Sequence, residues 1–130
     1  MPNVTGHRIL AEALKNEGVS TMFFVSGGPM DEFYDECDQL GIRLIDARHE
    51  QGAAMMAHGW SRVTGEVGIC AACSGPGTTN LVTGIVTAMA DACPVIALGG
   101  SSSSQRPRAF AAALRGQRQA ILFLGWQSKA

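Results

Sequence analysis

The chain has 130 residues, of which 46% are hydrophobic and 16% charged, and its formal net charge is −1. This length is enough for one domain with one core, and the composition excludes an intrinsically disordered protein. No apolar run approaches the roughly 20 residues that a membrane span needs. Residues 1–8 lack the charged and then apolar pattern of a signal peptide, so we expect a cytoplasmic protein.

Helices and strands are predicted to alternate along the chain. Thr5 is a typical N-cap for the first helix, which is expected to end at Gly18. Short apolar segments predict the strands, and apolar residues at helical spacing predict the helices. Strands are expected over residues 21–25, 42–47, 67–73 and 94–98, and further helices over residues 29–40, 51–63 and 78–90.

This order of elements predicts an α/β fold. The second and third strands carry apolar residues on both faces, and a helix separates them, which is typical of a parallel sheet covered by helices on both faces. Ligands of such sheets bind at the carboxyl ends of the strands. We therefore expect the chemistry in the loops of residues 26–29, 47–50 and 74–78.

The charge is divided unevenly along the chain. Residues 1–100 carry eleven acidic and five basic side chains, a net charge of −6, whereas residues 101–130 carry five basic side chains and no acidic one. Residues 101–104 are four serines, a composition typical of a linker. Basic segments often contact nucleic acids or membrane surfaces. Alternatively, residues 101–130 did not originate together with the rest of the chain. We expect neither a nucleic acid nor a membrane as a partner.

The loop of residues 74–78 has the sequence Ser-Gly-Pro-Gly-Thr between a buried strand and a helix. Glycines allow the backbone to approach a ligand closely, and the start of a helix offers free N–H groups. The loop matches neither the P-loop, because no lysine follows it, nor the GxGxxG dinucleotide motif. Taken alone, it is equally well interpreted as a tight structural turn.

Glu50 lies at the carboxyl end of the second predicted strand, with the small residues 52–54 behind it. Such a carboxyl group is expected to be partly desolvated, and desolvation lets a carboxyl group hold a proton near neutral pH. The alternative is a surface glutamate at a helix N-terminus. His49 alone does not indicate nucleophilic catalysis, because the chain has no GxSxG motif. His7 and His58 are expected on the surface.

Cys70 and Cys73 form a CxxC pair. A zinc site would need a second pair of ligands at matching spacing, and the chain has none. We therefore expect buried, inert thiols. The four cysteines do not imply disulfides in a cytoplasmic chain.

Three segments together resemble one family of enzymes. They are residues 48–54 (RHEQGAA), 74–85 (SGPGTTNLVTGI) and 94–100 (PVIALGG). They are similar to the N-terminal, pyrimidine-binding domain of thiamine diphosphate (ThDP) enzymes, in the branch of acetolactate synthase, oxalyl-CoA decarboxylase and 2-hydroxyacyl-CoA lyase. The resemblance covers about residues 5–101. It implies a ThDP-dependent lyase or carboligase that acts on 2-oxo or 2-hydroxyacyl substrates.

The resemblance also implies roles for single residues. Glu50 matches the family's catalytic glutamate, which hydrogen-bonds N1′ of the cofactor's aminopyrimidine and drives that ring to its imino form. Other positions match residues that line the pyrimidine end of the cofactor: Val25, Gly27, Pro76, Gly77 and Asn80. The chain departs from the family at Phe24 and Ser26, where glycine and proline are frequent. Phe24 is expected to add bulk beside the pyrimidine pocket.

Members of the family continue to a second ThDP domain, which holds Mg²⁺ and the diphosphate, and its motif does not occur in this chain. The resemblance therefore implies a partner, the diphosphate-binding domain of another chain, in a homo- or heterodimer or a higher oligomer. Mg²⁺ is expected only with that domain, and the chain alone is expected to be inactive. Residues 1–101 are interpreted as the N-terminal part of the pyrimidine-binding domain, and residues 102–130 as a basic tail, hypothetically a frame-shifted ending on a truncated enzyme.

Three other interpretations stay open. The chain is alternatively the small subunit of a split ThDP-dependent decarboxylase, or a non-catalytic truncated remnant whose basic tail binds an acidic partner. A nucleotide-binding protein of another family would share the fold, but the sequence lacks the phosphate-binding motifs. The sequence does not identify the substrate.

Overall fold

A parallel sheet of four strands forms the centre of the structure, a computed structural model that describes residues 4–100. In spatial order the strands are β2 (Arg43–Asp46), β1 (Thr21–Phe24), β3 (Gly68–Ala72) and β4 (Val95–Gly99). All three neighbouring pairs are parallel, and Cys70 of β3 pairs with Phe23 on one side and with Ala97 on the other. Because β1 and β3 are the inner strands, their carboxyl ends lie in the middle of one edge of the sheet.

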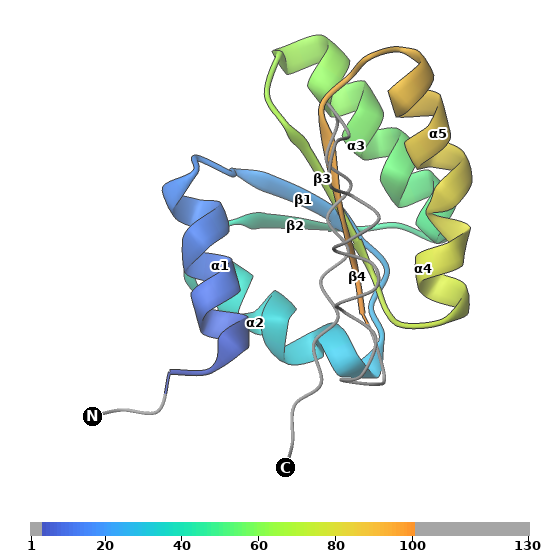
Figure 1. The fold of residues 1–130 in the computed structure, drawn as a ribbon. Helices are drawn as coiled ribbons and strands as arrows, with labels where there is room; N and C mark the ends of the chain where they lie inside the picture. The colour runs from blue at the N-terminus through green and yellow to red at the C-terminus, as the bar shows by residue number, and fades with distance from the viewer. Residues whose placement is uncertain (1–3, 101–130) are drawn as a thin grey trace, which may run out of the picture.

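Helices cover both faces of this sheet. They are α1 (Gly6–Asn16), the 3-10 helix η1 (Gly28–Met30), α2 (Asp31–Gln39), α3 (Glu50–Thr64), α4 (Pro76–Asn80) and α5 (Val82–Ala90). Figure 1 shows α1 and α2 on one face and α3, α4 and α5 on the other. The predicted α/β fold is confirmed. The helix expected over residues 78–90 is two helices, which separate at Leu81.

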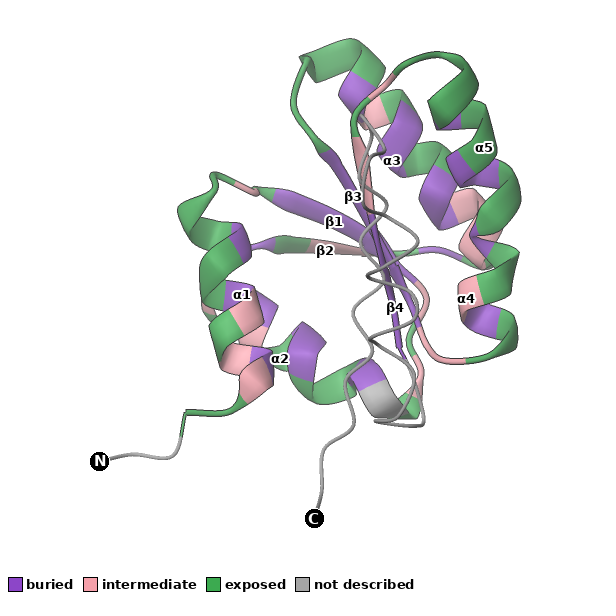
Figure 2. Cartoon of the chain, in the orientation of Figure 1, coloured by how far each residue is buried: buried purple, intermediate pink, exposed green. Residues whose placement is uncertain are grey.

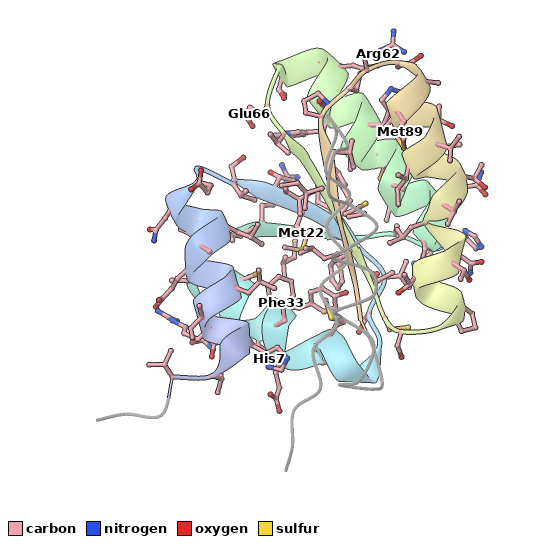
Figure 3. The ribbon with its side chains drawn as sticks, in the orientation of Figure 1. His7, Met22, Phe33, Arg62, Glu66 and Met89 are labelled. Carbon is pink, nitrogen blue, oxygen red and sulfur yellow. The ribbon has the colours of Figure 1, made fainter. Side chains whose placement is uncertain are left out.

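The two faces of the sheet bury two separate clusters of side chains. Met22 and Phe24 belong to the cluster beneath α1 and α2, whereas Phe23 between them belongs to the cluster beneath α3 and α5. This alternation is the period of two of a strand. Figure 3 shows Met22 and Phe33 pointing into the space between the sheet and α2, and Figure 2 shows the buried residues gathered on the sheet and the inner faces of the helices.

The second cluster is built mainly from small residues, which brings α3 close to β3 and α5. A Cβ atom at Gly68 would collide with the carbonyl group of Ala57, and a Cβ atom at Gly84 would lie 2.5 Å from Cβ of Ala54. The helix α3 ends at Gly65, whose φ of 76° is in the left-handed region that glycine adopts without strain. This close packing fixes the start of α3 relative to α4 and α5.

Two expectations about histidine were wrong. His7 and His58 are buried, with 4% and 7% of their surface exposed. His7 Nδ1 lies 3.1 Å from a carboxylate oxygen of Glu32, and His58 Nε2 lies 3.0 Å from Asp91 Oδ2. A histidine ring can be buried when one of its nitrogen atoms lies close to a carboxylate, because the carbon atoms of the ring then pack between helices. A single sequence does not show which carboxylate will pair with a histidine.

The second strand also differs from the expectation. It is only partly buried, because β2 lies at the edge of the described sheet. The predicted tail of residues 102–130 lies outside the described residues. None of the helices in the part of the chain that the structure describes has the length and apolar character that a membrane crossing requires.

Candidate functional site

Glu50 is the first residue of α3 and directly follows the loop after β2. The residue before it, His49, caps the helix, because its Nδ1 accepts a hydrogen bond from the backbone N–H of Gln51 at 3.1 Å. Glu50 is half-buried. The first turn of a helix presents unpaired N–H groups and the positive end of the helix dipole, so this position favours a carboxylate.

The two carboxylate oxygens of Glu50 have different surroundings. Asn80, the last residue of α4, donates a hydrogen bond from Nδ2 to Glu50 Oε2 at 3.0 Å. The other oxygen faces Gly77, where a Cβ atom would lie 3.3 Å from Glu50 Oε1. One oxygen is therefore held by the protein, and the other lies over a residue without a side chain.

The loop between β3 and α4 is held by its backbone and by Thr78. Gly75 has a φ of 68°, which favours glycine, and Pro76 begins α4, where its missing N–H costs nothing. The hydroxyl of Thr78 lies 2.8 Å from the carbonyl oxygen of Cys73 and 3.4 Å from that of Gly100. These contacts attach the loop to the end of β4.

The loop after β1 lies against the same edge of the sheet. The N–H of Val25 donates to the carbonyl oxygen of Ala71 at 3.3 Å, and the phenol of Tyr34 donates to the carbonyl oxygen of Val25 at 3.5 Å. Burial raises the pKa of Tyr34, which keeps this phenol protonated as a donor. Gly27 is in contact with Cys73, because a Cβ atom there would lie 2.6 Å from Cys73 Cβ.

The structure thus brings most of the predicted site residues together. Glu50, Gly77 and Asn80 are in mutual contact or joined by a hydrogen bond, and Gly27 joins them through Cys73. Val25 lies next to Gly27 at the end of β1, and the exposed Pro76 next to Gly77. Their roles toward a cofactor stay predictions.

The expectation for Phe24 was wrong. Its side chain is buried in the cluster beneath α1 and α2, with its ring centroid 4.3 Å from that of Tyr34. It therefore lies on the opposite face of the sheet from Gly77 and adds no bulk there. The reason is the alternation along β1, which directs every second side chain to the α2 face.

Cys73 is a site residue that the sequence interpretation missed. Cys70 is buried as expected, but Cys73 is only half-buried and follows the end of β3. Its neighbours Gly27 and Gly77 come from two different loops. The available signal was the pair of glycines in those loops, since glycine often marks a close approach of backbone to another group.

The four thiols are expected to differ in reactivity. Burial raises the pKa of Cys37 and of Cys70 to about 12, so these two hold almost no thiolate at mildly alkaline pH. Iodoacetamide should therefore label the half-buried Cys73 and Cys93 in the native chain and leave the other two unmodified. Mass spectrometry with a fully denatured control, in which all four are labelled, checks this. Equal labelling of Cys37 and Cys73 in the native chain would contradict the described burial.

Among residues 4–100, no group of three or more histidine, cysteine, aspartate or glutamate side chains is arranged to hold a metal ion. The polar groups that converge on the site are the Glu50 carboxylate, the Asn80 amide and the backbone of three loops. These polar groups suit an uncharged heterocycle that forms a hydrogen bond with the carboxylate.

The chain belongs to the family of thiamine pyrophosphate enzymes, whose N-terminal TPP-binding domain matches residues 4–121. Thiamine pyrophosphate is another name for ThDP. The match covers the whole described structure and reaches into the segment of residues 102–130. The family assignment agrees with the predicted resemblance.

Several of the similar proteins are acetolactate synthases. The acetolactate synthase isozyme 2 large subunit of Escherichia coli is 44% identical over 101 residues, which are 78% of this chain and 18% of that protein. The acetolactate synthase large subunit of Mycobacterium tuberculosis is 44% identical over 99 residues, 76% of this chain and 18% of that protein. A probable acetolactate synthase large subunit of Methanocaldococcus jannaschii is 50% identical over 95 residues, 73% of this chain and 16% of that protein. The chain therefore spans less than a fifth of the length of these relatives.

Proposed function

We propose that this chain supplies the pyrimidine-binding half of a ThDP site in an acetolactate synthase-like lyase or carboligase. The observation that carries the proposal is the carboxylate of Glu50, with one oxygen held by Asn80 and the other facing the bare backbone of Gly77. A cofactor ring approaching this site meets a carboxylate oxygen with no side chain beside it at residue 77. The residues present therefore fit the aminopyrimidine of ThDP.

When bound, ThDP supplies a thiazolium carbon that adds to carbonyl groups once it has lost its proton. Glu50 would share a proton with the ring nitrogen of the aminopyrimidine through Oε1, the oxygen that Asn80 does not hold. The half-buried position suits this role, because a carboxyl group that shares a proton works best away from bulk water. Asn80 holds the carboxylate through Oε2 and prevents it from rotating away.

The backbone of the loops completes this half of the site. Val25, Gly27, Pro76 and Gly77 lie at the carboxyl ends of β1 and β3, where ligands of parallel sheets bind. We propose that they line the pyrimidine ring and exclude water from one side of it. The substrates proposed are 2-oxo or 2-hydroxyacyl compounds, as the family resemblance implies.

The proposed partner is the diphosphate-binding domain of another chain, which would bring Mg²⁺ and hold the diphosphate. An exposed apolar stripe on α5, formed by Val82, Val86 and Met89, begins two residues after Asn80, and Met55 on α3 is exposed as well. Side chains at this spacing share one face of a helix. We propose that the partner domain covers this stripe and closes the open side of Glu50, since the relatives are more than five times as long as the matched segment. The cytoplasm is the proposed compartment, and the four free thiols support it.

The chain alone is expected to bind ThDP only weakly. It provides the proposed contacts to the pyrimidine ring but none of those to the diphosphate. Isothermal titration calorimetry should therefore give a Kd in the millimolar range, which corresponds to a binding free energy of about −4 kcal/mol. Addition of Mg²⁺ should leave this Kd unchanged. Tight binding that depends on Mg²⁺ would contradict the proposed division of the site between two domains.

A chimera tests the proposed function itself. Residues 4–100 of this chain would replace the aligned segment of the Escherichia coli acetolactate synthase isozyme 2 large subunit, to which it is 44% identical. Acetolactate formation by the purified chimera, dependent on ThDP, supports the proposal. A folded chimera that neither binds ThDP nor forms acetolactate contradicts it.

A further inference from the structure

Three glycines converge on one residue, Cys73: Gly27 in the loop after β1, Gly77 in the first turn of α4 and Gly100 directly after β4. A Cβ atom at Gly27 would lie 2.6 Å from Cys73 Cβ, and one at Gly77 would lie 2.8 Å from Cys73 Sγ. A Cβ atom at Gly100 would lie 2.9 Å from the backbone nitrogen of Ser74 and 3.3 Å from the carbonyl carbon of Cys73. Contacts this short leave no room for a side chain at any of the three positions, so Cys73 is packed directly against the backbone at the carboxyl end of the sheet.

The main chain of Cys73 is fixed as firmly as its side chain. Thr78 donates a hydrogen bond to its carbonyl oxygen at 2.8 Å, and the N–H of Gly100 donates to the preceding carbonyl group, that of Ala72, at 3.0 Å. The loop that carries Gly27 is held as well, because the phenol of Tyr34 donates to the carbonyl oxygen of Val25 at 3.5 Å. The main chain of Cys73 is therefore held in place when a neighbouring loop moves.

We propose that Cys73 is a positioning residue whose side chain sets the separation between the loops of residues 25–28 and 74–78, and with it the width of the pyrimidine end of the site. Gly77 transmits this separation to the reacting group, because the space that its side chain would occupy is bounded by both Cys73 Sγ and Glu50 Oε1. A smaller side chain at residue 73 lets the loops approach each other. A larger group between the loops pushes Gly77 toward the carboxylate.

This inference rests on the proposed function for its consequence, which is ThDP affinity, but its packing is testable separately. In the full 130-residue chain, Cys73→Ala should weaken ThDP binding about threefold, because the loops lose their spacer. Gly77→Ala should weaken it about tenfold, since its methyl group would lie 2.8 Å from the sulfur. In the double variant the sulfur is gone, which removes the 2.8 Å contact and leaves the methyl group 3.3 Å from Glu50 Oε1. The same Cys73→Ala change should therefore strengthen binding when residue 77 is alanine, although the double variant stays weaker than wild type.

The titration would be followed by NMR, which also reports the side-chain amide of Asn80 next to Glu50. The matched control is Gly59→Ala, in α3 and outside both loops, because a Cβ atom at Gly59 meets nothing within 4 Å. The conservative control is Cys73→Ser, which keeps the size of the side chain and should bind ThDP like wild type. Thermal denaturation of each variant separates a change at the site from a loss of folding.

The sign of the Cys73→Ala effect decides the proposal. An equal effect of Cys73→Ala in both backgrounds would overturn the positioning role, because independent sites are additive. A wild-type chain that does not respond to millimolar ThDP would count against the proposed function instead. The packing is then decided without ligand: the Asn80 amide resonance should shift in Gly77→Ala and return in the double variant, and a resonance that does not return would overturn the inference.

Discussion

Glu50→Gln in the acetolactate synthase chimera is expected to lower kcat by about 10² or more while changing the ThDP Kd by less than about threefold. Glutamine has the size of glutamate and keeps an oxygen that accepts the hydrogen bond from Asn80, so the site keeps its shape. It cannot share a proton with a ring nitrogen as a carboxyl group does. Loss of turnover without loss of binding is the result of removing an interaction that acts only in the reaction.

Two further variants sharpen this test. Glu50→Asp keeps the carboxyl group but shortens the side chain, and it should retain more activity than Glu50→Gln, because the acid function is present in a displaced position. Gly52→Ala, on the same helix and with nothing within 4 Å of the added methyl group, should have the activity of the unmodified chimera. A Glu50→Gln chimera with more than half of the original kcat would remove Glu50 from the mechanism and favour the non-catalytic remnant.

The order of the elements and the place of the site could be predicted because both depend on local signals. Apolar runs of strand length alternate with segments whose apolar residues have helical spacing. The loops at the carboxyl ends of β1, β2 and β3 carry the glycine, proline and glutamate residues that drew attention in the sequence. Glu50 and Asn80 are 30 positions apart, yet they meet because the crossover through α3 carries the chain from the end of β2 to β3, whose carboxyl end lies at the same edge of the parallel sheet. The topology predicted which loops meet, whereas Asn80 was named as a site residue only through the family resemblance.

The packing around the site could not be predicted, because it depends on which face of a strand a side chain occupies. From the sequence, Phe24 was expected beside the pyrimidine pocket. In the structure its side chain lies on the face of β1 that α2 covers, where it packs against Tyr34. Cys73 itself gave no signal, and the indirect signal came from glycines 46 residues before it and 4 residues after it. His58 is buried by a carboxylate 33 residues away. Long-range partners of this kind have no trace in a single sequence.

Gly84→Val is expected to reduce the free energy of unfolding by about 1–3 kcal/mol and to lower Tm by several degrees. A Cβ atom at Gly84 would lie 2.5 Å from Cβ of Ala54 and 3.1 Å from the backbone of Gln51 and of Met55. All of these atoms belong to α3, and none is the free end of a flexible side chain. The helix α5 must therefore move away from α3, although valine has a better intrinsic helix propensity than glycine.

A second glycine in a helix provides the matched control. Gly59 lies within α3, where a Cβ atom meets nothing within 4 Å, so Gly59→Ala should raise the free energy of unfolding by about 0.5–1 kcal/mol. Both changes replace a helical glycine, and only the space around each differs. Urea denaturation of the full chain measures both. Equal stabilisation by the two substitutions would show that α3 and α5 are not in close contact.

The displacement of α5 should also reach the site. Asn80 lies two residues before α5, so a shift of this helix away from α3 stretches the hydrogen bond from Asn80 to Glu50. In the chimera, Gly84→Val is therefore expected to lower kcat under conditions in which the protein stays folded, whereas Gly59→Ala should leave kcat unchanged. A folded Gly84→Val chimera with unaltered kcat would mean that the position of Asn80 does not matter to the carboxylate. The contact between α3 and α5 would then serve stability alone.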